Sequence, residues 1–201
     1  RDASQSYFCA LCFNRVCNLD ISMKIKIGQQ ELEYPKLRIE SGVTLCTGIS
    51  GSGKTTLLKA LHGLLWNESC ATLVDNRTTS LMPQQEVWIP YLSLKDQLNL
   101  FGGKQAIDLA QRLKLNMHLL KYPDELSVGQ LQRFSLALTL SNGSNLVLLD
   151  EPTSALDDDL ANIVFQLIEE YVSTKKAISI IAVTHDVRMK NHFYQANSWD
   201  L

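Results

Sequence analysis

No stretch of this 201-residue sequence approaches the roughly 18 to 20 consecutive apolar residues that a helix needs to cross a bilayer. The longest apolar segment, residues 177–183, contains a serine and has the length of a buried strand. Basic residues are not in excess either. The 19 Lys and Arg residues against 21 Asp and Glu residues give a net charge of −2, so the composition does not indicate nucleic-acid binding. If the protein acts at a membrane, we expect another polypeptide to span it.

Cysteines are few and odd in number: Cys9, Cys12, Cys17, Cys46 and Cys70. An odd, scattered set favours reduced thiols and a cytosolic setting over a disulfide framework. Cys9 and Cys12 form a CxxC pair, but no second pair and no nearby histidine supplies the remaining ligands of a metal site. With 45% apolar and 20% charged residues, the composition is typical of one globular domain and excludes a disordered chain or a coiled coil.

The order of the expected elements predicts an α/β fold with a mostly parallel sheet, because strands alternate with helices along the chain. Residues 1–22 show no clear period and are expected to form an N-terminal tail, so that the fold begins near Met23. Pro35 is typical of an edge strand. Apolar patterns predict strands over residues 23–27, 32–39, 43–47, 80–82, 146–149 and 178–183, and helices over 54–65, 127–140, 156–172 and 186–192, with short helices in 93–121 that break at Gly102-Gly103.

A glycine-rich loop lies between an expected strand and an expected helix. It reads Gly48-Ile49-Ser50-Gly51-Ser52-Gly53-Lys54-Thr55-Thr56, which matches the phosphate-loop pattern G-x-x-x-x-G-K-[ST]. Glycines let several backbone N–H groups point at phosphate oxygens, and the N-terminus of the following helix adds attraction for anions. Lys54 would reach the β- and γ-phosphates, and the Thr55 hydroxyl would bind Mg²⁺. The loop therefore predicts nucleotide binding.

Two acidic residues, Asp150 and Glu151, follow the apolar strand expected over residues 146–149. At the carboxyl end of a parallel strand they would lie beside the phosphate loop. An aspartate there can hold Mg²⁺, and an adjacent glutamate can accept a proton from an attacking water. Taken alone, two acids after a strand are more often a solvated loop or a helix cap. Together with the phosphate loop they predict nucleotide hydrolysis.

A third segment, Leu126-Ser127-Val128-Gly129-Gln130, completes a pattern that resembles the ATP-binding cassette (ABC) ATPase family. The family signature normally reads Leu-Ser-Gly-Gly-Gln, opens a helix and contacts the γ-phosphate bound to a second subunit. The resemblance spans about residues 23–201, as one ABC ATPase domain. It implies a P-loop NTPase fold with a mostly parallel sheet, a small antiparallel β-subdomain and a short helical subdomain at about residues 85–140.

Three further positions acquire roles through this resemblance. Gln84 looks like the Q-loop glutamine that senses Mg²⁺ and the γ-phosphate, and the spacing to Pro90 favours it over Gln85. Asp157 ends a Ser-Ala-Leu-Asp segment that resembles the D-loop, which crosses the dimer interface. His185 matches the histidine that contacts the γ-phosphate.

The resemblance implies a Mg²⁺-dependent ATPase that works as a head-to-tail dimer with a second ABC ATPase subunit. Hydrolysis would open the dimer and drive integral membrane transporter subunits from the cytoplasmic face of a membrane, with no nucleic acid as partner. The implied catalytic residues are Lys54, Gln84, Glu151 and His185. The implied ligands of Mg²⁺ are Thr55, Gln84 and Asp150, and those of ATP are Gly48, Ile49, Ser50, Gly51, Ser52, Gly53, Lys54, Thr55, Thr56, Gln84, Ser127, Gly129, Gln130 and Asp157.

Two departures from the family pattern affect these expectations. Val128 replaces the first glycine of the signature, and a β-branched residue excludes positive φ, so we expect weaker dimer closure. The family usually has an aromatic residue upstream of the phosphate loop that stacks on adenine, and residues 24–30 contain none. The candidates to replace that residue are Tyr34 and, in the tail, Tyr7, Phe8 and Phe13.

The region between the Q-loop and the signature contains Trp88, Ile89, Tyr91 and Leu92. These residues either pack inside a small helical subdomain or form the surface that receives a membrane subunit. Several functions stay open: a separate transporter ATPase, a fragment of a larger transporter polypeptide, a soluble family member in DNA repair or translation, or a regulatory nucleotide binder without turnover. The cargo and the direction of transport are not encoded in these motifs.

Overall fold

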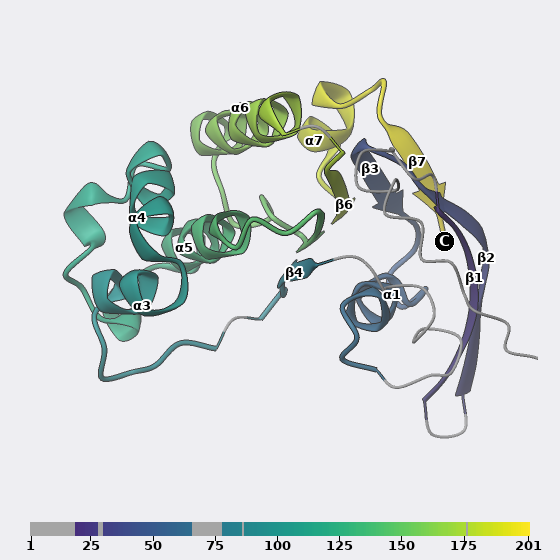
Figure 1. The fold of residues 1–201 in the computed structure, drawn as a ribbon, viewed down its shortest axis with the longest axis horizontal. Helices are drawn as coiled ribbons and strands as arrows, with labels where there is room; N and C mark the ends of the chain where they lie inside the picture. The colour runs from purple at the N-terminus through teal and green to yellow at the C-terminus, as the bar shows by residue number, and fades with distance from the viewer. Residues whose placement is uncertain (1–18, 28–29, 66–77, 86, 176) are drawn as a thin grey trace, which may run out of the picture.

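A computed structural model describes residues 19–27, 30–65, 78–85, 87–175 and 177–201. These residues form a five-stranded parallel sheet with helices on both faces, and a separate antiparallel hairpin (Figure 1). The predicted α/β fold with a mostly parallel sheet is confirmed. The sheet has the strand order β4 (Thr79–Met82), β5 (Leu146–Asp150), β6 (Ser179–Val183), β3 (Gly42–Thr47) and β7 (Asn197–Asp200).

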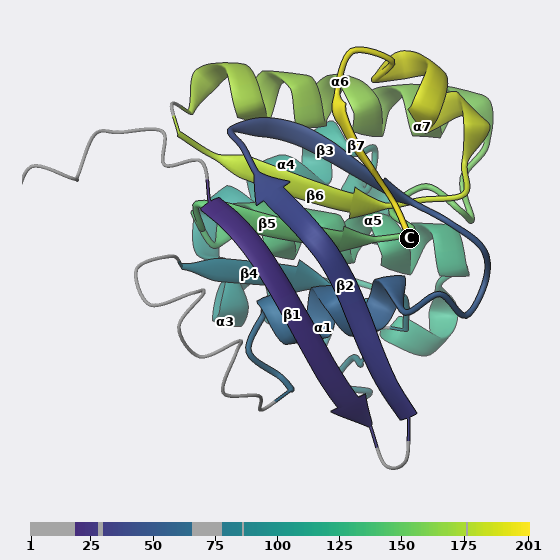
Figure 2. The same ribbon diagram turned by 90° about the vertical axis from the view of Figure 1, so that its right-hand side faces the viewer.

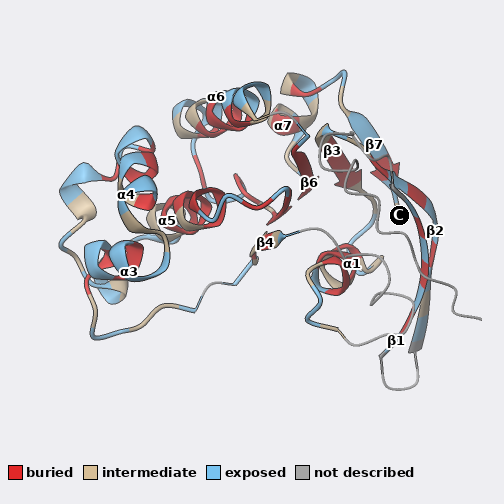
Figure 3. Cartoon of the chain, in the orientation of Figure 1, coloured by how far each residue is buried: buried red, intermediate tan, exposed pale blue. Residues whose placement is uncertain are grey.

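Two hydrophobic layers pack against the sheet because its central strands are apolar on both sides. Every residue of β5 and β6 is buried, and Figure 3 shows β6 in the colour of buried residues. Along β5, Val147 and Leu149 face one layer, whereas Leu146 and Leu148 face the other. This alternation follows the twofold period of a strand. Strands that are buried on both faces are typical of parallel sheets.

The helices divide between these two layers. Helix α1 (Lys54–Leu61) packs on the same face as the hairpin. The opposite face is covered by α5 (Val128–Ser141) and α6 (Asp158–Thr174), with α7 (Val187–His192) beside α6. Helices α3 (Leu94–Phe101) and α4 (Gly103–Arg112) pack against α5, and two 3₁₀ turns, Asn116–His118 and Pro123–Glu125, connect α4 to α5. The helix break expected at Gly102-Gly103 is confirmed.

The hairpin pairs β1 (Leu19–Ile27) with β2 (Gln30–Ile39) and crosses over α1 (Figure 2). Its register changes within one step, since Ile21 pairs with Leu37 but Met23 pairs with Tyr34. One residue of β1 therefore faces two of β2, at Pro35-Lys36, which is a β-bulge. The bulge accommodates a proline that has no N–H to donate, and it keeps the apolar side chains of both halves of β2 turned inward.

Several element boundaries differ from the expected ones. Strand β1 begins at Leu19 instead of Met23, and Ile21 is 1% exposed, so part of the expected tail belongs to the core. Strand β7 was not expected, because its sequence Asn-Ser-Trp-Asp has neither alternation nor an apolar run. Helix α6 starts at Asp158 because Asp157 accepts a hydrogen bond from the N–H of Leu160 and caps the helix.

Helix α1 ends at Leu61, four residues before the expected end. The N–H of Gly63 donates to the carbonyl of Ala60 at 3.0 Å, and the N–H of Leu64 donates to that of Lys59 at 2.9 Å. Gly63 has a φ of +82°. These features form a Schellman C-cap, in which a left-handed residue stops the helix. Leu64, which lies within the helix expected over residues 54–65, is therefore outside α1 and 62% exposed.

The C-cap predicts a graded response to substitution of Gly63. A Cβ there would meet no atom within 4 Å, so the cost comes from the left-handed backbone alone. Gly63→Ala should lower the free energy of unfolding by about 1 kcal/mol, and Gly63→Asn by less, because asparagine tolerates this conformation. Urea unfolding measures both variants. Equal stability of Gly63→Ala and the wild type would contradict the assigned cap.

Candidate functional site

The glycine-rich loop connects β3 to α1, where the sequence placed it. Gly53 is the N-cap of α1, and within the described chain no side chain caps the first N–H groups of this helix. Those N–H groups therefore point into the loop and can bind an anion, with the helix dipole in support. Gly48, Ile49 and Ser50 also line an open pocket of about 750 Å³, together with His185.

Lys54 is buried inside this loop, with 6% of its surface exposed. Its ammonium group donates to the carbonyl oxygens of Gly48 at 3.0 Å and Ile49 at 2.7 Å, and lies 3.4 Å from the Ser52 hydroxyl. The positive charge is thus held at the centre of the loop, without a carboxylate beside it among these contacts. This arrangement suits a site for the phosphates of a nucleotide.

Asp150 ends β5 and is almost completely buried, at 2% exposure. Its carboxylate accepts a hydrogen bond from Thr55, the second residue of α1. Burial raises the pKa of Asp150 above its ordinary value, although the hydrogen bond from Thr55 and the charges of Lys59 and Lys54 oppose this rise. Among the described residues its Oδ1 atom has no hydrogen-bond partner. A buried carboxylate oxygen without a partner, next to a threonine hydroxyl, fits a site for a hard cation.

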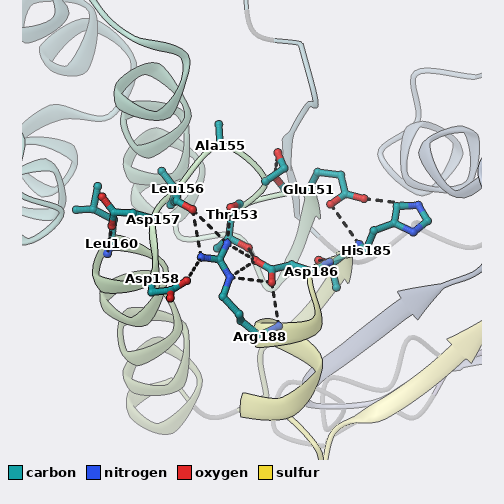
Figure 4. A network of polar contacts seen from close by, with 12 residues as sticks. Glu151, Thr153, Ala155, Leu156, Asp157, Asp158, Leu160, His185, Asp186 and Arg188 are labelled. Carbon is teal, nitrogen blue, oxygen red and sulfur yellow. Dashed lines mark hydrogen bonds and ion pairs between the residues drawn. The ribbon is translucent and has the colours of Figure 1, made fainter.

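Glu151 follows directly and faces His185 (Figure 4). The backbone N–H of His185 lies 3.3 Å from Oε2 of Glu151, and the His185 Nε2 atom lies 3.8 Å from Oε1. Burial raises the pKa of Glu151 above its ordinary value, although the N–H of His185 opposes this rise. A glutamate with a raised pKa at the mouth of a phosphate site is suited to act as a proton acceptor.

An arginine-centred network ties the segment that follows the glutamate to the segment that follows the histidine (Figure 4). Arg188 donates to Asp186 at 2.8 Å and to Asp158 at 2.7 Å, and both terminal nitrogens lie 3.2 Å from the carbonyl oxygen of Leu156. The Thr153 hydroxyl donates to Asp186 at 2.7 Å. Burial alone would raise the pKa of Asp186, but the hydrogen bonds from Arg188 and Thr153 hold it below its ordinary value.

The signature segment opens α5. Ser127 is the N-cap, its hydroxyl accepts from the N–H of Gln130 at 3.3 Å, and the Gln130 side chain accepts from the N–H of Ser127 at 2.9 Å. This reciprocal pair is a capping box. Gly129 lies against the segment that follows Glu151, since a Cβ there would be 2.5 Å from the carbonyl oxygen of Ala155. The structure thus joins the signature segment to the expected D-loop.

The expected site residues therefore form two groups. The first group contains the phosphate loop, Asp150, Glu151 and His185, which meet at the carboxyl ends of β3, β5 and β6. The second group contains the signature residues and the segment before α6, in which Asp157 serves as a helix cap. Gln84 is exposed, two residues beyond the end of β4. The functional roles of all these residues stay predictions.

The structure shows the surroundings of Val128 and Tyr34, the two described residues that the departures from the family pattern concern. Val128 is the first helical residue of α5 and has no left-handed backbone, and its side chain is 72% exposed. The valine therefore fits its backbone conformation, and the expected weakening of dimer closure stays a prediction. Tyr34 is buried, and its hydroxyl donates to the carbonyl of Gly53 at 2.9 Å. It supports the phosphate loop from beneath and is not free to stack on adenine. Tyr7, Phe8 and Phe13 lie outside the described residues.

Sequence reasoning missed two residues that organise the site. Arg188 holds the network described above, and Gln132 donates to the carbonyl oxygen of Glu151 at 2.6 Å. Apart from the bonds of Arg188 to Asp186, both act on residues more than 15 positions away in the chain, so no local spacing indicates these contacts. A polar residue at an otherwise buried position of an apolar helix is the one signal that could have indicated Gln132.

A phosphate loop between a parallel strand and a helix, with a buried carboxylate at the end of another strand, defines a P-loop nucleotide-binding domain. The family model described as "ABC transporter" matches residues 36–154. The chain is 32% identical over 198 residues to HrtA of Staphylococcus saprophyticus, named as a hemin import ATP-binding protein, covering 83% of this chain and 89% of that one.

Two solved structures share the fold. The ATP-binding subunit of an ABC transporter superposes with a TM-score of 0.75 at 17% identity, covering 88% of this chain and 83% of that one. The dimeric cassette MJ0796, bound to ADP and phosphate, gives a TM-score of 0.70 at 23% identity, covering 87% and 90%. The family match and the HrtA relative place this chain in the ABC transporter family. It is an ATP-binding, ATP-hydrolysing part of a transporter.

Burial of Asp150 predicts a conflict between stability and binding. A folded-state pKa above the unfolded value means that the stability contributed by the protonated group is present at low pH and is lost as pH rises through the folded pKa. At pH 7 the ionised Asp150 is therefore destabilising. Asp150→Asn should raise the unfolding temperature in metal-free buffer, by roughly 2 to 4 °C for a gain of about 1 kcal/mol.

Thermal unfolding at pH 7 and at pH 5 tests this expectation. The wild type should become more stable relative to Asp150→Asn on acidification, because its carboxylate takes up a proton. An Asp150→Asn variant that unfolds at a lower temperature than the wild type at pH 7 would contradict the account.

Proposed function

We propose that this chain is one half of a head-to-tail dimer that binds ATP with Mg²⁺ at the site around the phosphate loop. The observation that carries the proposal is the buried Asp150, whose Oδ1 has no partner among the described residues, beside Thr55 and Lys54. The proposed ligands of the cation are Asp150, Thr55 and Gln84. When bound, Mg²⁺ would neutralise charge on the β- and γ-phosphates.

The proposed reaction depends on positioning and charge. The first N–H groups of α1 and the Lys54 ammonium bind the phosphates, and Lys54 exchanges loop carbonyls for phosphate oxygens as its acceptors. Glu151 accepts a proton from the attacking water, and His185, whose ring is half exposed towards the pocket, donates to the γ-phosphate. Ser127 and Gly129 of a second copy close over the same phosphate.

The dimer and the membrane partners draw support from the relatives. The related cassette MJ0796 has been solved as a dimer, and HrtA is named as an ATP-binding protein of a hemin import system. None of the helices in the described part of the chain is long and apolar enough to cross a membrane. We therefore place the chain at the cytoplasmic face of a membrane, bound to spanning subunits, with hemin as the first cargo to test.

The region after the Q-loop offers a surface for such a subunit. The buried amide of Gln97 exchanges hydrogen bonds with the backbone of Ile89, at 2.9 and 3.1 Å, and fixes this segment. Trp88 packs against the core, whereas Val87 and Tyr91 are 97% and 79% exposed. Packing inside the subdomain therefore applies to Trp88, whereas a surface for a membrane subunit is proposed for Val87 and Tyr91. Exposed apolar side chains on a fixed segment suit a protein interface.

Replacement of the proposed base should stop turnover without preventing binding. Glu151→Gln should lower the rate of phosphate release by roughly 10² to 10⁴, with ATP affinity retained. Burial raises the pKa of Glu151, so the wild-type kcat should fall with decreasing pH in a limb above the ordinary range of a glutamate. Phosphate release against pH measures both effects. The exposed Glu31→Gln is the matched control.

The same variant tests the dimer, because blocked hydrolysis should hold the ATP-bound form closed. Light scattering of Glu151→Gln with MgATP should give twice the monomer mass, whereas Lys54→Ala, which cannot hold the phosphates, should stay monomeric. If Glu151→Gln with MgATP also stays monomeric, this result would contradict the head-to-tail dimer. Unchanged phosphate release by Glu151→Gln would contradict the assigned base.

Membrane docking predicts a second, independent defect. Tyr91→Asp should abolish recovery of a multi-spanning membrane protein in a detergent pull-down from native cells, because a charge enters an apolar interface. Basal ATPase activity should be unchanged. Tyr194→Asp, at a tyrosine that is 76% exposed on the segment after α7, is the matched control. Recovery of ribosomal or DNA-repair proteins alone would contradict the transporter assignment.

A further inference from the structure

The backbone of Glu151 adopts an unusual conformation. Its φ is +53°, in the left-handed region that non-glycine residues seldom adopt and that is found mainly where surrounding contacts enforce it. On one side, the N–H of Glu151 donates to the carbonyl oxygen of Val183 in β6 at 2.9 Å. On the other side, its carbonyl oxygen accepts from the N–H of Ser154 at 3.4 Å and from the Ser154 hydroxyl at 3.2 Å, within the turn itself.

Gln132 supplies a further donor, from a different helix. Its Nε2 atom donates to the carbonyl oxygen of Glu151 at 2.6 Å and to the hydroxyl of Ser154 at 3.1 Å. Its Oε1 atom accepts from the N–H of Ala155 at 3.3 Å. The side chain is buried, with 8% of its surface exposed. One amide thus binds three groups of the turn that carries the glutamate, and both of its N–H groups and its oxygen are used.

The helix that carries Gln132 lies close against this turn. Gln132 lies five residues after Ser127, the N-cap of α5. Between them, Gly129 packs closely against Ala155, because a Cβ at Gly129 would lie only 2.5 Å from the carbonyl oxygen of Ala155. The start of α5 and the turn after β5 therefore pack as one unit. A displacement of α5 would move the backbone of Glu151 with it.

We propose that Gln132 is a positioning residue for Glu151: its amide holds the glutamate backbone in the left-handed conformation and joins it to the helix that begins at the signature segment. This inference rests on the proposed role of Glu151 as the base. Only a side chain with both donors and an acceptor can make these contacts. A glutamate at this position would turn a carboxylate towards the carbonyl oxygen of Glu151, and an apolar residue would remove both the donor to that oxygen and the acceptor for the N–H of Ala155.

Replacement by an apolar residue of similar size tests the proposal. Gln132→Met should lower kcat by about 10- to 100-fold, because a base displaced by about 1 Å loses its alignment with the attacking water. The affinity for ATP should change by less than about twofold, since Gln132 contacts no part of the phosphate loop among the described residues. Gln111→Met, at an exposed glutamine of α4, is the matched control.

A double-variant cycle separates positioning from a general structural effect. Single-turnover hydrolysis is measured for Gln132→Met in the wild type and in the Glu151→Gln background. If Gln132 acts through the Glu151 carboxylate, its substitution should change the residual rate of Glu151→Gln by less than about twofold. An equal loss in both backgrounds, or a raised KM with unchanged kcat, would overturn the proposal.

The milder variant Gln132→Asn covers the case in which Gln132→Met does not fold. It keeps the amide but withdraws it by one methylene, so a smaller loss of kcat is expected. Unfolding of both variants under conditions where Gln111→Met is folded would show that Gln132 serves stability, and the proposal would be wrong.

These measurements also distinguish a failure of the proposed function from a failure of the inference about Gln132. Absence of turnover in the wild type, or unchanged turnover in Glu151→Gln, would contradict the proposed function itself. An active wild type and an inactive Glu151→Gln, together with a fully active Gln132→Met, would contradict only the inference about Gln132.

Discussion

A carboxylate buried at the end of β5 is the constraint on which the rest of this structure depends. Asp150 is 2% exposed, and a charge in that environment is unfavourable unless a cation or a donor compensates it. The apolar strand that carries it, its pairing with β6, and the packing of α1 against the sheet together place it beside Thr55 and the phosphate loop. The fold thus creates a position that is unfavourable alone and that the proposed cation and phosphates would stabilise.

The proposed hydrolysis requires more than this position, because Glu151 can act as the base only if its carboxylate points at a water beside the phosphate. Its left-handed backbone is fixed by contacts from two directions, β6 on one side and α5 on the other. The network around Arg188 then fixes the following turn against the segment that carries His185. The residues proposed to contact a second copy and the residues proposed to perform the chemistry are therefore connected by hydrogen bonds and packing within one chain.

The sequence predicts the parts of this arrangement that depend on local patterns. The parallel sheet follows from apolar strands that alternate with helices, and the phosphate loop, Asp150 and Glu151 follow from their positions at strand ends. Strand β7 could not be predicted, because its pairing with β3 depends on Trp199 reaching the core. The support of Gly53 by Tyr34 and of Glu151 by Gln132 was also invisible, since each contact joins distant residues. The early end of α1, in contrast, could have been predicted from the sequence, because Gly63 is a local signal for a C-cap.

Calorimetry of ATP binding with and without Mg²⁺, for the wild type and for Asp150→Asn, tests directly whether the buried carboxylate holds a cation. We predict that Mg²⁺ strengthens ATP binding by the wild type, by about 10-fold or more, because the cation would be held between Asp150 and the phosphates. In Asp150→Asn this gain should largely disappear, while binding of ATP without Mg²⁺ is retained. An equal gain from Mg²⁺ in both proteins would show that the buried carboxylate does not hold the cation, and the proposed Mg²⁺ site at Asp150 would be wrong.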